Sequence, residues 1–149
     1  MKRHHLCTIA TALSICSITL TDNAPTAASR AGFVTAKVSC AELVDKITIL
    51  EIKSLKFDGE KKKNVDIELE MLREVLATLP QSAELQRLKD ELYAINLKFW
   101  NIQDDIRAKE RDKQFDQEFI ELARSVYVVN ESRNQVKYAI NKLCSSTSF

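Results

Sequence analysis

The stretch LQRLKDELYAINLKFWNIQDDI, residues 85–106, decides the fold of this chain of 149 residues. Its apolar residues recur after alternating steps of three and four positions, which places them on one stripe of an α-helix. A helix with such a stripe is stable in water only when the stripe packs against another apolar surface. The stripe consists of Leu85, Leu88, Leu92, Ile95, Phe99, Ile102 and Ile106.

A second stripe with the same spacing follows the short polar segment Arg111–Gln114. A connection this short favours antiparallel packing of the two helices. Val126–Val129 within the second stripe is rich in β-branched residues and alone would suggest a strand, but the stripe continues through it in register, which favours a helix. The second stripe consists of Phe115, Phe119, Leu122, Val126, Val129, Arg133, Val136, Ile140 and Leu143.

Capping and breaking residues set the helix boundaries. Ser39 and Glu42 have the spacing of a capping box at a helix start, and Gly59 suits the end of that helix. Pro80 stops a second helix, and Ser82 caps a third. The sequence therefore predicts four helices, over about residues 39–57, 61–79, 82–110 and 115–143.

These helices predict an all-α protein: an antiparallel up-down bundle with coiled-coil-like packing. The chain has only 2 Gly and 2 Pro, which disfavours an all-β fold with its many turns. Residues 36–145 are expected to form a single bundle domain, and residues 146–149 a frayed tail.

The composition of the chain argues against several classes of function. The net charge of +1 gives no strong field for nucleic acid. The two histidines, His4 and His5, lie near the N-terminus, outside the helical region, so histidine-based catalysis and metal binding are not expected there. With 2 Gly there is no glycine-rich phosphate loop. We therefore expect no metal site, no cofactor and no enzyme signature, although acid–base chemistry by Asp, Glu and Lys stays open.

Residues 1–35 differ from the rest of the chain. A basic start is followed by the uncharged apolar run Leu6–Leu20 and then by small residues up to Ala28, which is the layout of a secretory signal peptide. Fifteen apolar residues are too few for a stable membrane span, which takes about 20. Cleavage near Ala28 would make the protein secreted or periplasmic. Otherwise this segment is a disordered leader, upstream sequence from a misplaced start codon, a transit peptide or an anchor, and without export the protein is cytoplasmic.

Two cysteines stand at opposite ends of the helical region. In an up-down four-helix bundle the first helix begins where the last one ends, so Cys40 and Cys144 could lie close together. A disulfide between them is one interpretation, and two thiols in a reducing compartment is the other.

Polar residues form stripes beside the apolar ones, on the expected first, third and fourth helices. Such residues either pair across helices and fix their register, or line a groove with Trp100 and Tyr127 as walls and Arg107 or Arg124 facing an anion. The candidate binding residues are Glu42, Asp45, Lys46, Asn96, Trp100, Arg107, Arg124, Tyr127, Asn130, Arg133, Lys137 and Asn141.

Several segments resemble the bacterial Domain of Unknown Function 6165 family: Glu42–Lys53, Asn64-Val65, parts of Asn96–Arg107, and Phe119–Tyr127 continuing to Asn141. The resemblance covers about residues 38–145. It implies a small helical protein with no established activity, associated with glycosyltransferase and surface-glycan machinery. The chain departs from the family pattern at Cys40-Ala41 and at Ser145–Phe149.

Two functions follow as hypotheses. The first is a non-catalytic helical interaction module, an accessory to cell-envelope or surface glycan assembly, with protein helices or a second copy as partners. The alternative is a small-ligand-binding protein or enzyme that acts on an anionic sugar or nucleotide through a polar groove between the third and fourth helices.

Overall fold

The computed structural model describes residues 36–146 and shows four helices and no strand in that range. The prediction of an all-α fold is therefore confirmed, and each helix end lies within three residues of its expected position. The helices are α1 (Cys40–Lys56), α2 (Gly59–Ala77), α3 (Ala83–Arg111) and α4 (Gln117–Ser146).

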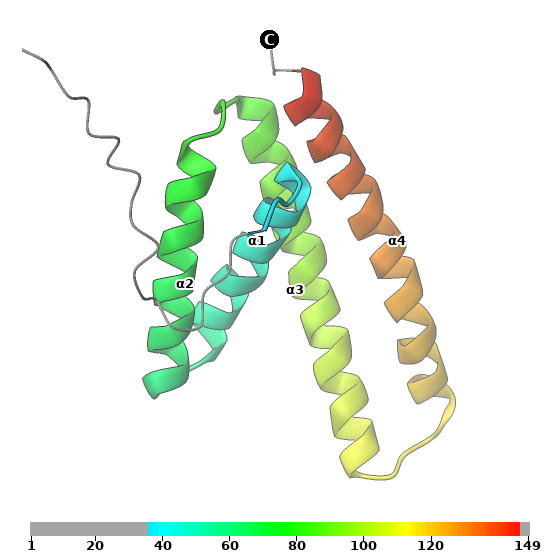
Figure 1. Cartoon of the computed structure of the whole chain (residues 1–149). Coiled ribbons are helices and arrows are strands. Elements are labelled where there is room, and N and C mark those ends of the chain that lie inside the picture. The colour runs from blue at the N-terminus through cyan, green and yellow to red at the C-terminus, as the bar shows by residue number, and fades with distance from the viewer. Residues whose placement is uncertain (1–35, 147–149) are drawn as a thin grey trace, which may run out of the picture. The chain divides into compact units, whose positions relative to one another are not determined.

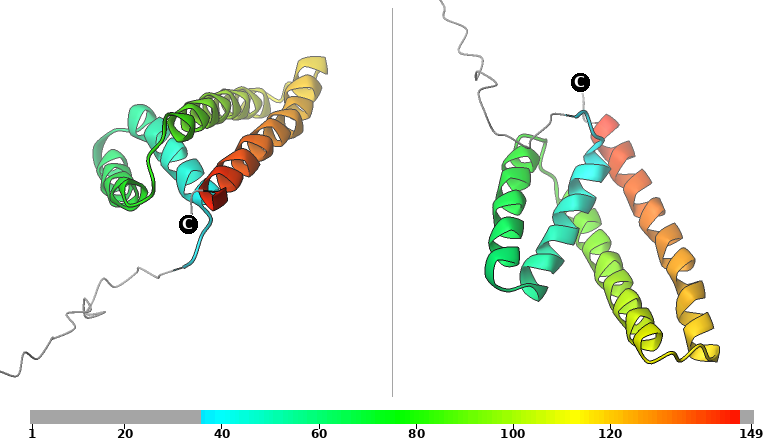
Figure 2. Two further views of the ribbon diagram at one scale, coloured as in Figure 1. Left: turned by 90° about the horizontal axis from the view of Figure 1, so that it is seen from above. Right: turned by 60° about the horizontal axis from the view of Figure 1, so that its bottom comes forward.

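Successive helices run in opposite directions, as expected for an up-down bundle (Figure 1). The central helix is α1, whose backbone approaches those of α2, α3 and α4. The backbone of α2 approaches that of α1 alone among the described helices. Figure 2 shows the same arrangement from two further directions, with α2 on one side of α1 and the long α3–α4 hairpin on the other.

The central place of α1 follows from its sequence, which is apolar on two faces. One face packs in a cluster with α3 and α4, and the other packs in a cluster with α2. A helix that is apolar nearly all round has to be covered from more than one side. The first cluster contains Ala41, Val44, Leu85, Leu88, Leu92, Val136 and Ile140, and the second contains Leu43, Ile47, Leu50 and Leu69.

Serine side chains cap α1 and α3 as the sequence predicts. The backbone N–H of Glu42 donates to Ser39 Oγ at 3.3 Å, and that of Leu85 donates to Ser82 Oγ at 3.0 Å. The carboxylate of Glu42 pairs with Lys137 of α4. The Glu42 side chain therefore joins two helices, a role that the local capping pattern does not reveal.

Two boundary residues were assigned wrongly from the sequence. Gly59, expected to end the first helix, begins α2 with a φ of 58°, a conformation that glycine adopts easily. Phe115, expected on the apolar stripe, precedes α4 and is 57% exposed. Helix α4 starts after Asp116, whose Oδ1 accepts a hydrogen bond from the backbone N–H of Phe119 at 3.0 Å.

The α3–α4 hairpin is longer than the other two helices. Helix α3 has 29 residues and α1 has 17, or about 43 Å against about 25 Å at 1.5 Å per residue. The hairpin therefore continues past α1 and α2 to its connecting loop (Figure 1). Near α1 the stripe residues Leu92 and Ile140 are 0% exposed. Beyond it a group that we call the distal seam is only half-buried: Phe99, Ile106, Phe119, Leu122 and Val126.

Among the described residues, no helix is both long enough and apolar enough to cross a bilayer. Ser146, expected in the frayed tail, is the last residue of α4. The rest of that tail, residues 147–149, and the signal-peptide interpretation of residues 1–35 fall outside the described residues.

Candidate functional site

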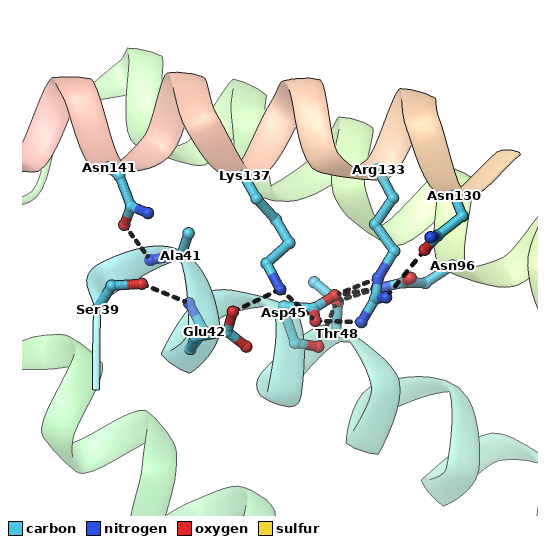
Figure 3. A network of polar contacts seen from close by, with 10 residues as sticks. All are labelled: Ser39, Ala41, Glu42, Asp45, Thr48, Asn96, Asn130, Arg133, Lys137 and Asn141. Atoms are coloured by element: carbon cyan, nitrogen blue, oxygen red, sulfur yellow. Dashed lines mark hydrogen bonds and ion pairs between the residues drawn. The ribbon is translucent and has the colours of Figure 1, made fainter. Parts of the chain in front are cut away.

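A polar cluster centred on Asp45 lies where α1 meets α3 and α4 (Figure 3). Asp45 is 3% exposed, and its side chain faces Arg133 of α4. Nε of Arg133 donates to Asp45 Oδ1 at 2.9 Å, and Nη2 of the same guanidinium donates to Oδ2. This two-point contact fixes the orientation of both side chains. It fastens the first helix to the last.

Lys137 joins the same cluster one turn further along α4. Its Nζ lies 3.3 Å from Asp45 Oδ2 and 2.7 Å from Glu42 Oε1. Together with Arg133, two cations face two carboxylates, so the cluster carries no net charge.

Asn96 contributes the contact from α3. Its Nδ2 donates to Asp45 Oδ1 and to Thr48 Oγ1, both at 2.9 Å, and Asn96 is 5% exposed. The Thr48 hydroxyl in turn donates to the backbone oxygen of Asp45 at 2.9 Å. Thr48 was missed in the sequence. Its position three residues after Asp45, on the apolar face of the helix, is the signal that could have identified it.

Asn141 of α4 caps the start of α1 from outside that helix. Its Oδ1 accepts a hydrogen bond from the backbone N–H of Ala41 at 3.0 Å. The first N–H groups of a helix have no partner within the helix, so this contact satisfies one of them. It is a further polar link between α1 and α4, in addition to those made by Arg133 and Lys137 (Figure 3).

The surroundings of Asp45 act on its pKa in opposite directions. Burial raises the pKa, whereas hydrogen bonds from Arg133 and Asn96 and the charges of Arg133 and Lys137 lower it. The second group of effects prevails, and the pKa of Asp45 lies below its ordinary value. The cluster therefore favours the ionised carboxylate in the folded protein.

This shift predicts a specific loss of stability in acid. Because the folded pKa of Asp45 is below the unfolded value of about 3.9, its stabilising contribution is complete well above pH 4. It declines as the pH falls through the folded pKa. Urea unfolding between pH 3 and pH 7 should give a steeper loss of stability at low pH for the native chain than for Asp45→Asn. Equal pH dependence of the two proteins would contradict the shift.

A cavity of about 170 Å³ adjoins the polar cluster. Trp100 lines it and packs edge-on against Phe57, with ring centroids 6.0 Å apart. The indole N–H of Trp100 is the one polar side-chain atom in the described part of the chain that is buried without a hydrogen-bond partner. The cavity is lined by Ile49, Ile52, Asn96, Phe99, Trp100 and Arg133.

Comparison of the sequence with models of known protein families identifies one matching family. Residues 34–148 match the model of a family described as "Family of unknown function (DUF6165)". This chain belongs to the DUF6165 family. The match covers all four helices and confirms the resemblance seen in the sequence. No curated protein and no solved structure matches the chain.

The structure of this DUF6165 protein brings together seven of the twelve candidate residues. Six lie in or beside the Asp45 cluster: Asp45 itself, Glu42, Asn96, Arg133, Lys137 and Asn141. Trp100 lines the adjoining cavity. Asn130 lies at the margin, since its Oδ1 accepts a long 3.5 Å contact from Arg133 Nη1.

The other four candidates lie apart from the Asp45 cluster. Arg107 is exposed and bonds within its own helix, to Asp104 and Gln103. Lys46 pairs with Glu68 of α2 at 3.1 Å. Tyr127 is 65% exposed, and Arg124 is exposed as well.

A second junction between helices lies outside the twelve candidate residues. Glu51 Oε1 lies 3.1 Å from Arg73 Nη2 of α2 and 2.8 Å from Lys89 Nζ of α3. It thereby connects three helices, beside an open cavity of about 370 Å³ that Tyr93 also lines. Within residues 36–146, no group of three or more His, Cys, Asp and Glu side chains is placed to hold a metal ion.

The two cysteines of the helical region lie together as thiols at the end of the bundle. Cys40 and Cys144 both pack against the core cluster shared by α1, α3 and α4. Burial, together with the hydrogen bond and charge of Cys40, raises the pKa of Cys144 to about 12. The Cys144 thiol is therefore protonated at neutral pH.

Proposed function

We propose that this DUF6165 protein is a non-catalytic interaction module that binds an amphipathic helix on its distal seam. The observation that carries the proposal is the change in burial along one helix face. Phe99 and Ile106 follow the fully buried Leu92 at intervals of seven residues, so all three lie on nearly the same side of α3. Leu92 is in the cluster that includes α1, but Phe99 and Ile106 are only half-buried.

On α4 as well, the face that contacts α1 continues into the distal seam. Val126 comes seven residues before Arg133, and Phe119 comes eighteen residues before Lys137, which are close to two and five turns. Arg133 and Lys137 contact α1. The face that binds α1 therefore continues beyond it as an apolar surface. Apolar surface of this kind is stabilised by a further helix.

The Asp45 cluster supports a structural role for the polar residues. Asp45 and Glu42 balance Arg133 and Lys137, so the cluster has no surplus positive charge to attract an anion. Asn96 Nδ2 and both carboxylate oxygens of Asp45 form hydrogen bonds with other groups of the chain. Such a cluster specifies how α1 sits on the hairpin. The setting that we propose, from the resemblance to the family, is surface-glycan assembly.

Photocrosslinking tests the proposal. A photoreactive phenylalanine derivative replaces Phe115, which is exposed beside the distal seam, or Tyr138, which is 72% exposed on α4. After irradiation of cells that express the chain, we expect one dominant adduct from position 115, identified by mass spectrometry, and none from position 138. Equal adducts from both positions, or none, would contradict the proposal. If nucleotide sugars raise the melting temperature by several degrees while position 115 gives no adduct, the ligand-binding alternative is favoured instead.

A further inference from the structure

We propose that the occupant of the distal seam is a second copy of this chain. Its α3–α4 hairpin lies antiparallel on the first hairpin, and each copy places Phe115 in the other's cavity beside Trp100. This inference rests on the proposed function and identifies the partner. It follows from the position of α1, an exposed aromatic ring, the size of the cavity and the charges at the edge of the seam.

The position of α1 allows one arrangement of two identical copies. In each copy α1 covers the proximal part of the face that continues as the distal seam. Two hairpins whose loops point the same way would bring the two α1 helices into collision. Hairpins whose loops point in opposite directions meet seam to seam about a two-fold axis, which is the closed arrangement most common among dimers. The distal seam of each copy then covers the distal seam of the other copy.

In this arrangement the loop of one copy reaches the end of α1 in the other. Phe115 lies in that loop, is 57% exposed and touches Phe119 edge-on, with ring centroids 5.3 Å apart. A large aromatic side chain exposed at a loop is the residue type that anchors protein interfaces.

The cavity at the end of α1 is suited to receive a phenyl ring. Its volume is about 170 Å³, and four of its lining residues are Ile49, Ile52, Phe99 and Trp100. An apolar cavity of about 150 Å³ holds one benzene molecule. The reciprocal arrangement therefore fills both cavities with residues already present in the chain.

Charges at the edge of the seam also fit a second copy. Gln103 and Glu110 follow Asn96 at intervals of seven residues, and Arg107 lies between them, so these residues continue the face of α3 that contacts α1. Arg107 and Glu110 have opposite charges and are exposed. When two α3 helices lie antiparallel about a two-fold axis between residues 108 and 109, each Arg107 lies opposite the other copy's Glu110. A self-complementary pair of charges is what a two-fold interface requires.

Light scattering on the full chain during size-exclusion chromatography tests the inference. We expect twice the chain's mass at high concentration and dissociation on dilution. Phe115→Lys should weaken the dimer by about 30-fold or more, the effect of losing a buried aromatic anchor. Because Phe115 is exposed in the single chain, this substitution leaves the helices folded, and circular dichroism verifies that. Tyr138→Lys, which removes an equally exposed aromatic outside the seam, should leave the mass unchanged.

Two further measurements make the result specific. Arg107→Glu and Glu110→Arg should each weaken the dimer, and the double variant should recover it. Trp100 is the single tryptophan of the chain, so its emission should shift to shorter wavelength as the native protein associates, but not in Phe115→Lys. A monomeric mass for the native chain at every concentration, or equal effects of Phe115→Lys and Tyr138→Lys, would overturn the inference.

The photocrosslink separates failure of this inference from failure of the proposed function. An adduct at position 115 that contains only this chain supports both. An adduct with a different protein, together with a monomeric purified chain, overturns the second-copy inference and leaves the interaction module standing. Absence of an adduct at position 115 together with a monomeric chain overturns both.

Discussion

Replacing Arg133 by alanine should lower the free energy of unfolding by about 3–5 kcal/mol. The substitution removes both hydrogen bonds from the guanidinium to Asp45, whose side chain is 5% exposed. Lys137 remains at 3.3 Å, but it also serves Glu42 and cannot replace a two-point contact. A buried carboxylate is then left with too few partners, which costs more than the loss of an exposed ion pair. Urea unfolding measures the difference.

Arg87→Ala is the matched control. Arg87 is also a helical arginine with two carboxylate partners, at 2.8 Å from Glu84 and 3.0 Å from Glu91, but all three residues are exposed on α3. Exposed pairs within one helix contribute about 0.3–0.5 kcal/mol each. In addition, Asp45→Asn should recover part of the stability lost in Arg133→Ala, because it removes the unpaired charge. If the two alanine variants are equally stable, the Asp45 cluster does not hold the helices together.

Oxidation of Cys40 and Cys144 to a disulfide should raise the free energy of unfolding by about 4–5 kcal/mol. The bond would close a loop of roughly 100 residues, and the stabilisation follows from the entropy that this loop removes from the unfolded chain. The two thiols already lie together against one core cluster, so little rearrangement is needed. Oxidised glutathione would accept the two electrons and two protons that the thiols release. Urea unfolding of oxidised and reduced protein measures the gain.

The control for the disulfide accounts for the other cysteines. The chain has 4 Cys, so the comparison uses a background with Cys7→Ser and Cys16→Ser. In that background Cys40→Ser should abolish any difference between oxidised and reduced protein. Oxidation should also be faster at alkaline pH, because the pKa of Cys144 is about 12. Two thiols that still react with a thiol reagent after prolonged oxidation would contradict the prediction.

The apolar stripes predicted the fold because their spacing directly encodes helix faces. The stripe from Leu85 to Ile106 lies within α3, and Ser82 caps that helix as expected. Phe115 shows the limit of the pattern. It has the right spacing for the stripe, but the carboxylate of Asp116 caps α4 one residue later and leaves Phe115 outside the helix. Periodicity alone does not distinguish the last loop residue from the first residue of a helix.

The residues of the Asp45 cluster could be predicted only in part from the sequence. Spacing groups polar residues on a helix face, but it does not say which neighbour covers that face. Arg133 and Tyr127 were grouped together, yet Arg133 contacts α1 and Tyr127 is 65% exposed. Because α1 is shorter than α3, within residues 36–146 only the proximal part of each polar stripe meets α1. That length difference was present in the predicted helix ranges and could have suggested where the cluster ends.

The Asp45–Arg133 contact also has a consequence for the order in which the chain folds. Its two residues are 88 positions apart, whereas α3 and α4 are joined by a loop of a few residues. Closing a long loop has a larger entropic cost than closing a short one, and contacts between distant positions slow folding. The α3–α4 hairpin is therefore expected to assemble early, as a template with Arg133, Lys137 and Asn96 already in line. Helix α1 is then expected to dock last on that template. An apolar surface alone would allow several positions of α1 along the hairpin, and the polar cluster selects one of them.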